Sequence, residues 1–342
     1  MTLIHGFELL KTQHVPELNS IAHLYRHART GAELLSLEND DENKVFGITF
    51  RTPPPDSTGL PHIMEHAVLA GSHKYPARDP FIELMKGSLA TFVNAMTFPD
   101  FTTYPVASQN TQDFYNLIDV YVDAVLHPLL HPFTLMQEGW HHELENLDAP
   151  LTYHGVVFNE MKGAYSAPDA LLGKYGLEAL FPGHPYGRDA GGDPRRIPDL
   201  TYAQFKQFHE TYYHPSNARI YFYGNDDPEE RLKKTSQFLQ GFQKVELDST
   251  IPLQANFPQP KWLEFPYDAS QDENARKGLV TVNWMLGELD NPELSLGLGI
   301  LNHILTGTPA SPLRKALHDS RLGEALVGDA LETLLRQPCY TV

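Results

Sequence analysis

The chain has 342 residues, of which 41% are hydrophobic and 20% charged, enough apolar material for more than one packed core. Its 26 basic and 43 acidic residues leave a formal net charge of −17, which argues against a nucleic-acid backbone as a partner. The single cysteine, Cys339, excludes a disulfide framework and a cysteine-rich zinc site, so any bound metal must be held by histidines and carboxylates.

The N-terminal residues show no targeting pattern. Residues 1–8 lack the basic segment followed by an apolar stretch that marks a secretory signal, and they are not rich in Arg and Ser. No window approaches the roughly 20 apolar residues that span a membrane. We therefore expect a cytoplasmic protein with no membrane partner. A processed organellar form would have the same sequence.

Strand-like and helix-like patterns follow one another along the first 245 residues. Alternation predicts strands over residues 21–25, 45–50, 92–106 (around a turn at Pro99-Asp100) and 219–224. Helical periodicity predicts helices over residues 60–70, 113–125, 134–145, 156–165, 201–213 and 228–241, with a short helix after Pro80. Ser57 and Thr58 are candidate N-caps of the first of these helices. The order of these elements indicates an α+β fold rather than alternating βαβ units.

The composition changes after residue 245, where four prolines fall in a stretch with few helical signals. We expect residues 1–245 to form one α+β domain, 246–275 a linker with an entry strand, and 276–342 part of a second domain. In that part a strand is expected over 278–286 and helices over 291–307 and 312–320. The final residues, 338–342, are again strand-like, so we expect a domain truncated inside a strand.

A metal-ligand pattern lies on the helix predicted over 60–70. His62-Ile63-Met64-Glu65-His66 is H-x-x-E-H, and residues four apart share one face of a helix. His62 and His66 can therefore direct ring nitrogens at one ion, while Glu65 flanks that face. Catalytic zinc sites need three protein ligands, an open position and a base beside the metal-bound water. The pattern predicts His62 and His66 as metal ligands and Glu65 as the catalytic base.

The third ligand must come from elsewhere in the chain. Glu160, within Gly155-Val156-Val157-Phe158-Asn159-Glu160-Met161-Lys162-Gly163, is the strongest candidate. Glu143 and Glu145 are rivals, and spacing alone does not choose among the three. A site with two histidines and one carboxylate suits Zn²⁺, and it could also take manganese or cobalt.

Ordered sequence blocks extend well beyond this motif. Between residues 50 and 225 they resemble the inverzincins, the pitrilysin-like M16 metallopeptidases, and most closely their presequence protease branch. The blocks are Phe50-Arg51-Thr52-Pro53, Asp56-Ser57-Thr58-Gly59, Pro61 to His66, Gly71-Ser72-His73-Lys74-Tyr75-Pro76, Arg78-Asp79-Pro80-Phe81, Phe92-Val93-Asn94-Ala95-Met96-Thr97, Gln137-Glu138-Gly139-Trp140, Gly155 to Gly163, Gly191-Gly192-Asp193-Pro194 and His214-Pro215-Ser216-Asn217-Ala218.

The resemblance implies a site and a fold. The family's third zinc ligand falls in the block that contains Glu160, so Glu160 inherits that role. The implied fold has M16-type α+β units, each with a mixed or antiparallel sheet packed against helices, here one full unit and part of a second. A peptide is expected to add as a strand at a sheet edge near Asn94 and Ala95.

Two functions are compatible with these features. The leading hypothesis is a zinc-dependent endopeptidase that degrades unstructured, presequence-like peptides or oligopeptides through Glu65-assisted attack of a metal-bound water. The family's enzymes are longer and close a second half over the substrate, so we expect the C-terminal half of the same polypeptide as a partner. The alternative is a non-catalytic fragment or scaffold of the same fold that binds peptide or zinc without turnover.

Overall fold

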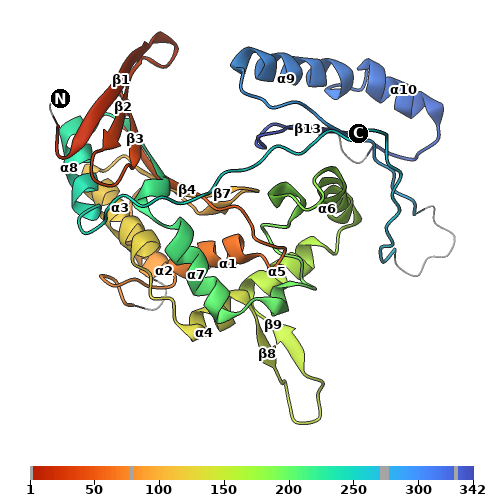
Figure 1. The fold of residues 1–342 in the computed structure, drawn as a ribbon, viewed down its shortest axis with the longest axis horizontal. Helices are drawn as coiled ribbons and strands as arrows, with labels where there is room; N and C mark the ends of the chain where they lie inside the picture. The colour runs from red at the N-terminus through yellow and green to blue at the C-terminus, as the bar shows by residue number, and fades with distance from the viewer. Residues whose placement is uncertain (1–2, 78–79, 270–276, 327–329) are drawn as a thin grey trace. The chain divides into compact units, whose positions relative to one another are not determined.

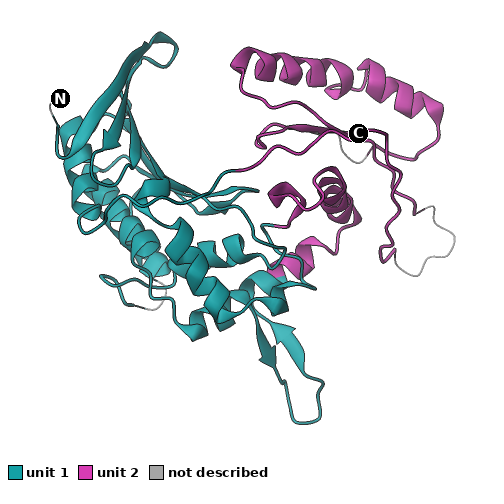
Figure 2. Ribbon diagram, viewed as in Figure 1, with its two compact units in different colours: residues 1–159, 190–250 teal, residues 160–189, 251–342 magenta. Residues whose placement is uncertain are grey.

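The computed structural model describes residues 3–77, 80–269, 277–326 and 330–342. Contacts divide the chain into two compact units. Unit 1 comprises residues 1–159 and 190–250, and unit 2 comprises residues 160–189 and 251–342 (Figure 2). The domain boundaries predicted from composition, at residues 245 and 275, stay a prediction.

Unit 1 is built on an eight-stranded sheet (Figure 1). The strand order is β1-β2-β3-β10-β4-β7-β5, and β6 also pairs with β7. Among the described pairs, β3 with β10 is parallel and the others are antiparallel, so the sheet is mixed as expected. The strands are β1 (Phe7–Val15), β2 (Ser20–His27), β3 (Glu33–Glu38), β4 (Lys44–Arg51), β5 (Ala90–Val93), β6 (Met96–Thr97), β7 (Phe101–Ser108) and β10 (Ala218–Gly224).

The two faces of this sheet differ in burial, because side chains alternate along each strand. On one face, Phe46, Tyr104 and Phe222 are buried, and the rings of Phe46 and Phe222 pack edge-on at 5.1 Å. Phe114 of helix α3 (Thr111–Leu126) joins them, so α3 covers that face. Burying each such side chain contributes about 1.5–3 kcal/mol. The opposite face keeps partly exposed residues.

Most predicted elements of unit 1 are present, and the α+β class is confirmed. The remaining helices are α1 (Leu60–Val68), α2 (Pro80–Gly87), α4 (Pro132–Thr134), α7 (Tyr202–Tyr212) and α8 (Pro228–Phe238), with the first turn of α5 (Val156–Ala164). Short 3-10 turns are η1 (Pro16–Leu18), η4 (Ile197–Asp199) and η5 (Pro215–Asn217). The patterns missed β1 and β3.

Two local predictions are wrong. Neither Ser57 nor Thr58 caps α1, because the Thr58 hydroxyl donates to Asp56 Oδ1 at 2.6 Å and Gly59 takes the cap position. The helix expected over 134–145 is replaced by a π-helical turn, η2 (Leu135–Gly139), and then by strand β8 (His141–Glu143). Pairing of β8 with β9 (Thr152–His154) in a hairpin overrides the local helical periodicity.

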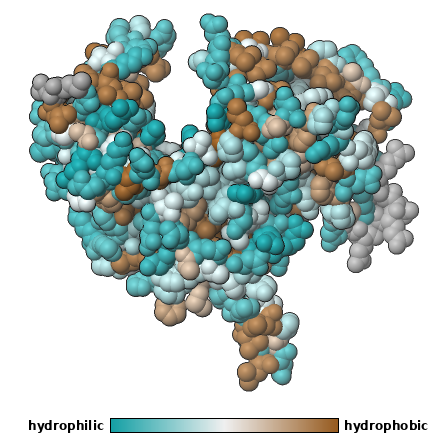
Figure 3. Space-filling view, in the orientation of Figure 1, coloured by the Kyte–Doolittle hydropathy of each residue, from teal (hydrophilic) through white to brown (hydrophobic). Residues whose placement is uncertain are grey.

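The β8–β9 hairpin ends in an apolar tip. Leu144, Leu147 and Leu151 lie in the connecting loop and are exposed, Leu147 by 93%. In the space-filling view, hydrophobic colour gathers at the end of this hairpin (Figure 3). Among the described helices of the whole chain, none is long and apolar enough to cross a membrane.

Unit 2 combines helices with a small sheet. The helices are α6 (Pro168–Leu180), missed by the sequence patterns, α9 (Pro292–Thr306) and α10 (Pro312–Ser320), with the 3-10 turn η3 (Pro185–Gly187). The sheet has the order β11 (Asn283–Met285), β13 (Cys339–Thr341), β12 (Ala330–Glu332). The strand predicted over 278–286 is therefore shorter than expected.

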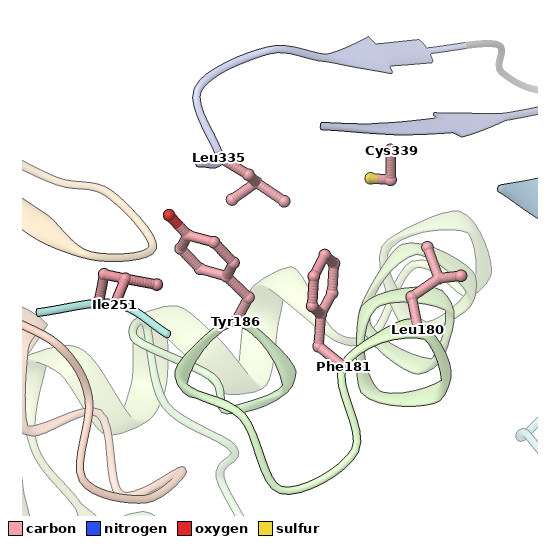
Figure 4. Close-up of a cluster of buried hydrophobic side chains, with 6 residues drawn as sticks. All are labelled: Leu180, Phe181, Tyr186, Ile251, Leu335 and Cys339. Atoms are coloured by element: carbon pink, nitrogen blue, oxygen red, sulfur yellow. The ribbon is translucent and has the colours of Figure 1, made fainter. Parts of the chain in front are cut away.

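The core of unit 2 joins residues distant in sequence (Figure 4). Phe181 and Tyr186 pack at 5.5 Å between ring centroids, and Leu335 and Cys339 lie in the same buried cluster. The backbone N–H of Arg336 donates to the Tyr186 hydroxyl at 2.8 Å, which satisfies this polar atom inside the core. Burial raises the pKa of the Cys339 thiol to about 11, so the chain's one thiol is unreactive at neutral pH.

Candidate metal centre

Helix α1 carries the H-x-x-E-H motif and is held by a close backbone crossing. Its N-cap, Gly59, has φ +70°, and a Cβ there would lie 2.7 Å from the Gly191 carbonyl oxygen. Only glycine combines this left-handed conformation with so close an approach. Ile63 and Met64 are fully buried on the opposite face of α1. The helix is therefore anchored on both sides, which fixes the direction of its polar face.

The two histidines are oriented through their Nδ1 atoms. His62 Nδ1 lies 3.0 Å from the Gly191 carbonyl oxygen, and His66 Nδ1 lies 3.3 Å from Glu138 Oε2. Their rings stand edge-to-face with centroids 5.0 Å apart. A histidine whose Nδ1–H donates to a carbonyl or carboxylate presents Nε2 as the free ligand atom. Both rings are thus arranged as ligating histidines are in metalloproteins.

Glu65 lies in a poorly solvated position beside these rings. Its side chain is buried, and Thr97 Oγ1 donates to its Oε2 at 2.6 Å. Burial raises the pKa of Tyr121, and the nearby Glu65 carboxylate raises it further. The carboxylate is therefore held in one orientation, close to the histidines but bound to a different partner from either.

Glu160 follows from helix α5, which begins against the π-helical turn. A Cβ on Gly155 would lie 2.1 Å from the Gly139 carbonyl oxygen, so the two backbones touch at the start of α5. Val157 and Phe158 are buried in the first turn. The division into units falls between Asn159 and Glu160, inside this continuous helix. The anchored first turn therefore sets the position of Glu160.

One ligand atom from each of His62, His66 and Glu160 lies within 4.8 Å of the others. Within the described residues this is the one cluster of at least three His, Cys, Asp or Glu side chains with that spacing. The rival Glu143 lies instead on β8, with Oε2 at 3.0 Å from His154 Nδ1, and Glu145 is exposed beyond it. The geometry thus brings Glu160, rather than either rival, to the two histidines.

Asn94 and Ala95 lie at the turn between β5 and β6, beside the sheet edge formed by β5. The Asn94 N–H donates to the Pro105 carbonyl at 3.1 Å, and its side-chain oxygen accepts from the Ala95 N–H at 3.0 Å. These two residues are therefore structured as a strand-end turn. Two residues further on, Thr97 contacts Glu65.

Sequence patterns did not single out three groups that contact the motif: Glu138, Thr97 and the Gly191 carbonyl. Each is more than 30 residues from the side chain it contacts, so no local periodicity links them. The π-helical turn that presents Glu138 is itself a signal, since such turns are frequent at functional sites. It became visible only in the folded chain.

Two family models match the sequence. Residues 51–162 match the family described as Insulinase (Peptidase family M16), and residues 199–334 match the family described as Peptidase M16 inactive domain. Presequence protease 1, chloroplastic/mitochondrial, from Arabidopsis thaliana is 52% identical over 343 residues, which cover 98% of this chain and 32% of that protein. A mitochondrial presequence protease from Mus musculus is 43% identical over 328 residues, covering 94% and 32%.

A solved structure shows the same fold. The crystal structure of a peptidase M16 inactive domain from Pseudomonas fluorescens matches with a TM-score of 0.70 at 16% identity, covering 97% of this chain and 73% of that one. At so low an identity the match concerns the fold alone. The chain spans about a third of the length of the curated relatives it matches.

Proposed function

Because the chain belongs to the M16 peptidase family, in its presequence protease branch, we propose that it is a zinc-dependent endopeptidase acting on unstructured peptides. The observation that carries this proposal is the cluster of His62, His66 and Glu160, with Glu65 on the same helix as the two histidines. The names of the relatives, both presequence proteases, support peptide hydrolysis as the reaction.

The donor set fits zinc. Two imidazoles with engaged Nδ1 atoms and one carboxylate make the three-ligand set of catalytic zinc sites, leaving one position open. Tetrahedral ligands at about 2.1 Å from zinc lie roughly 3.4 Å from one another. Small side-chain rotations bring ligand atoms that lie within 4.8 Å to that separation. Zinc, when bound, supplies a Lewis acid for the scissile carbonyl.

Glu65 is the proposed general base. Its carboxylate takes the proton of the water that attacks the carbonyl carbon of the peptide bond. It then gives this proton to the amine that leaves, so the same group serves as base and acid. The hydrogen bond from Thr97 leaves Oε1 of Glu65 for this proton transfer and fixes its direction. Glu138 and the Gly191 carbonyl hold the imidazoles in place.

Substrate binding is proposed at the edge of β5. This strand ends the sheet order, so its outer N–H and C=O groups face away from the strands described here. An extended peptide can pair with such an edge, with Asn94 and Ala95 at its end. Main-chain pairing makes few demands on side chains, which fits unstructured peptides as a broad substrate class.

The test compares metal content and peptide cleavage in the parent and in Glu65→Gln. We expect the variant to bind zinc as tightly as the parent and to lose at least a hundredfold in cleavage rate, since general-base catalysis contributes about 10²–10⁴-fold. Glu145→Gln is the matched control, because it alters an exposed carboxylate outside the cluster. Equal cleavage by Glu65→Gln and the parent would show the mechanism to be wrong.

A second candidate function is binding of peptide or zinc without turnover. The observation that favours it is the length of the chain, about a third of its relatives. The rest of such a polypeptide is then the proposed partner that closes over the substrate. Zinc and peptide binding with no cleavage by the purified chain, and cleavage restored by adding that partner, would select this alternative.

The location of the protein is also a proposal. One relative is named chloroplastic/mitochondrial and the other mitochondrial, which supports an organellar form as an alternative to the predicted cytoplasmic one. Nucleic acid is not a proposed partner, given the net charge of −17. Fractionation of cells that express a tagged protein would decide between the two compartments.

A further inference from the structure

A cavity of about 570 Å³ lies on the open face of the sheet in unit 1. The register of the strands places its floor. Arg219 of β10 is opposite Thr49 of β4, and Arg51, two residues after Thr49, is opposite Phe101 of β7. Residues opposite each other, and residues two apart on one strand, share a face of a sheet. These four side chains therefore meet on the face that α3 does not cover.

The wall of the cavity is held by side-chain hydrogen bonds. Asn217, which is buried, donates through Nδ2 to the Arg51 and Tyr212 carbonyls, both at 2.8 Å. Its Oδ1 accepts from the Ser249 hydroxyl at 3.0 Å. The Asn217 amide therefore ties the end of β4, the end of α7 and the segment after α8 together.

A second set of bonds fixes the segment that carries Lys244. The Lys244 N–H donates to the Arg29 carbonyl at 2.9 Å, and the Val245 N–H donates to the Ser216 hydroxyl at 3.1 Å. Ser216 Oγ in turn donates to the Thr30 carbonyl at 2.7 Å. The cavity is thus a built feature, with its walls bonded to the sheet beneath.

Positive charge gathers here in a strongly acidic chain. Arg51, Arg219 and Lys244 line the cavity, against one acidic residue, Glu246. Arg219 is shared with Glu33, its Nε lying 3.1 Å from Glu33 Oε2. In the described part of the chain, neither the Arg51 guanidinium nor the Lys244 ammonium has a recorded hydrogen bond or ion pair. Two unpaired cations converge on one cavity although the chain carries a net charge of −17.

We propose that this cavity binds an oxyanion, a carboxylate or a phosphate, between Arg51 and Lys244. A guanidinium donates two parallel hydrogen bonds to either group, and an ammonium adds a point charge. Phe101 and Leu247 also line the cavity, so the body of the ligand can pack against apolar surface while its anionic end meets the cations. None of the clustered metal-site residues lines it, and the proposal stands apart from peptidase activity.

Calorimetric titration of the intact chain tests the proposal with two probes. One is inorganic phosphate, and the other is a short peptide with a free C-terminal carboxylate, compared with its C-terminal amide. Binding of phosphate alone identifies a phosphate ligand. Binding of the acid but not the amide identifies a peptide carboxylate. Saturable binding of neither probe at low ionic strength overturns the proposal.

Variants place the binding. Arg51→Met and Lys244→Met are each expected to weaken the binding probe about tenfold, since a charge-assisted hydrogen bond is lost. Arg51→Lys keeps the charge and should bind more tightly than Arg51→Met. Lys206→Met removes an exposed cation from α7, outside the cavity, and is the matched control. Equal weakening by this control, or unchanged affinity in Arg51→Met and Lys244→Met, overturns the site; thermal unfolding checks that each variant is folded.

Discussion

Thr97 Oγ1 donates a 2.6 Å hydrogen bond to Oε2 of Glu65, and so joins strand β6 to helix α1. Thr97 lies two residues after Ala95, at the edge where a peptide is proposed to pair. The residue that orients the proposed base is therefore on the same short segment as the proposed substrate edge. A peptide that orders this edge would also order the base.

The first prediction concerns this hydrogen bond. Thr97→Val keeps the shape of the side chain and removes the donor, and a hydrogen bond to a charged group contributes about 1.5–3 kcal/mol. We expect kcat for an unstructured peptide to fall about ten- to a hundredfold, with KM and zinc affinity close to those of the parent. Thr97→Ser restores the hydroxyl and should recover most of kcat. A loss of the same size in both variants would contradict the assigned role.

The second prediction concerns Glu138. Glu138→Gln weakens the acceptor for His66 Nδ1–H, so His66 becomes a less basic and less fixed ligand. We expect zinc affinity, measured by competition with a chelator, to fall about 10–100-fold, the usual effect of losing such a partner. Glu143→Gln changes a carboxylate that contacts His154 rather than His66, and should leave zinc affinity unchanged. If both variants bind zinc like the parent, Glu138 does not support the site.

The third prediction concerns the crossing of Gly59 and Gly191. Gly59→Ala adds a Cβ 2.7 Å from the Gly191 carbonyl oxygen at a residue with φ +70°. The left-handed conformation alone costs about 1–2 kcal/mol, and the contact adds to it. We expect the free energy of unfolding in urea to fall by at least about 2 kcal/mol. Gly163→Ala, in open space within α5, is the control and should be neutral or slightly stabilising.

The fourth prediction concerns pH and His209. Burial lowers the pKa of His209 to about 4, and its Nε2 lies 2.9 Å from the Val125 carbonyl oxygen. In the unfolded chain this histidine titrates near 6.5, so between pH 6.5 and 4 the unfolded state binds a proton that the folded state does not. The free energy of unfolding should therefore be constant above pH 6.5 and fall on acidification, by at most about 3 kcal/mol at pH 4.

His209→Gln isolates this contribution, because glutamine keeps an N–H donor for the Val125 carbonyl and does not titrate. Urea unfolding at pH 7 and pH 5 should show a smaller loss of stability for the variant than for the parent. An identical loss in both proteins would mean that other groups carry the acid sensitivity of unit 1.

Local patterns were sufficient for most of the helices and for the metal motif. The strands at 21–25 and 45–50, and the helices at 60–70, 113–125 and 201–213, are all present, because each has an unbroken period in the sequence. The same period put His62 and His66 on one face of α1. The prediction failed over 134–145, where pairing of β8 with β9 outweighs the helical pattern.

What the sequence by itself determined is the face of one helix: two histidines four residues apart, with Glu65 beside them. Spacing left Glu143, Glu145 and Glu160 open, and only the resemblance chose among them before the fold was known. The tertiary structure decided which carboxylate reaches the histidines, and it brought Glu138, Thr97 and the Gly191 carbonyl to the motif. The physical reason is range: helix periodicity acts over four residues, whereas these contacts depend on backbone crossings between segments 30 to 130 residues apart.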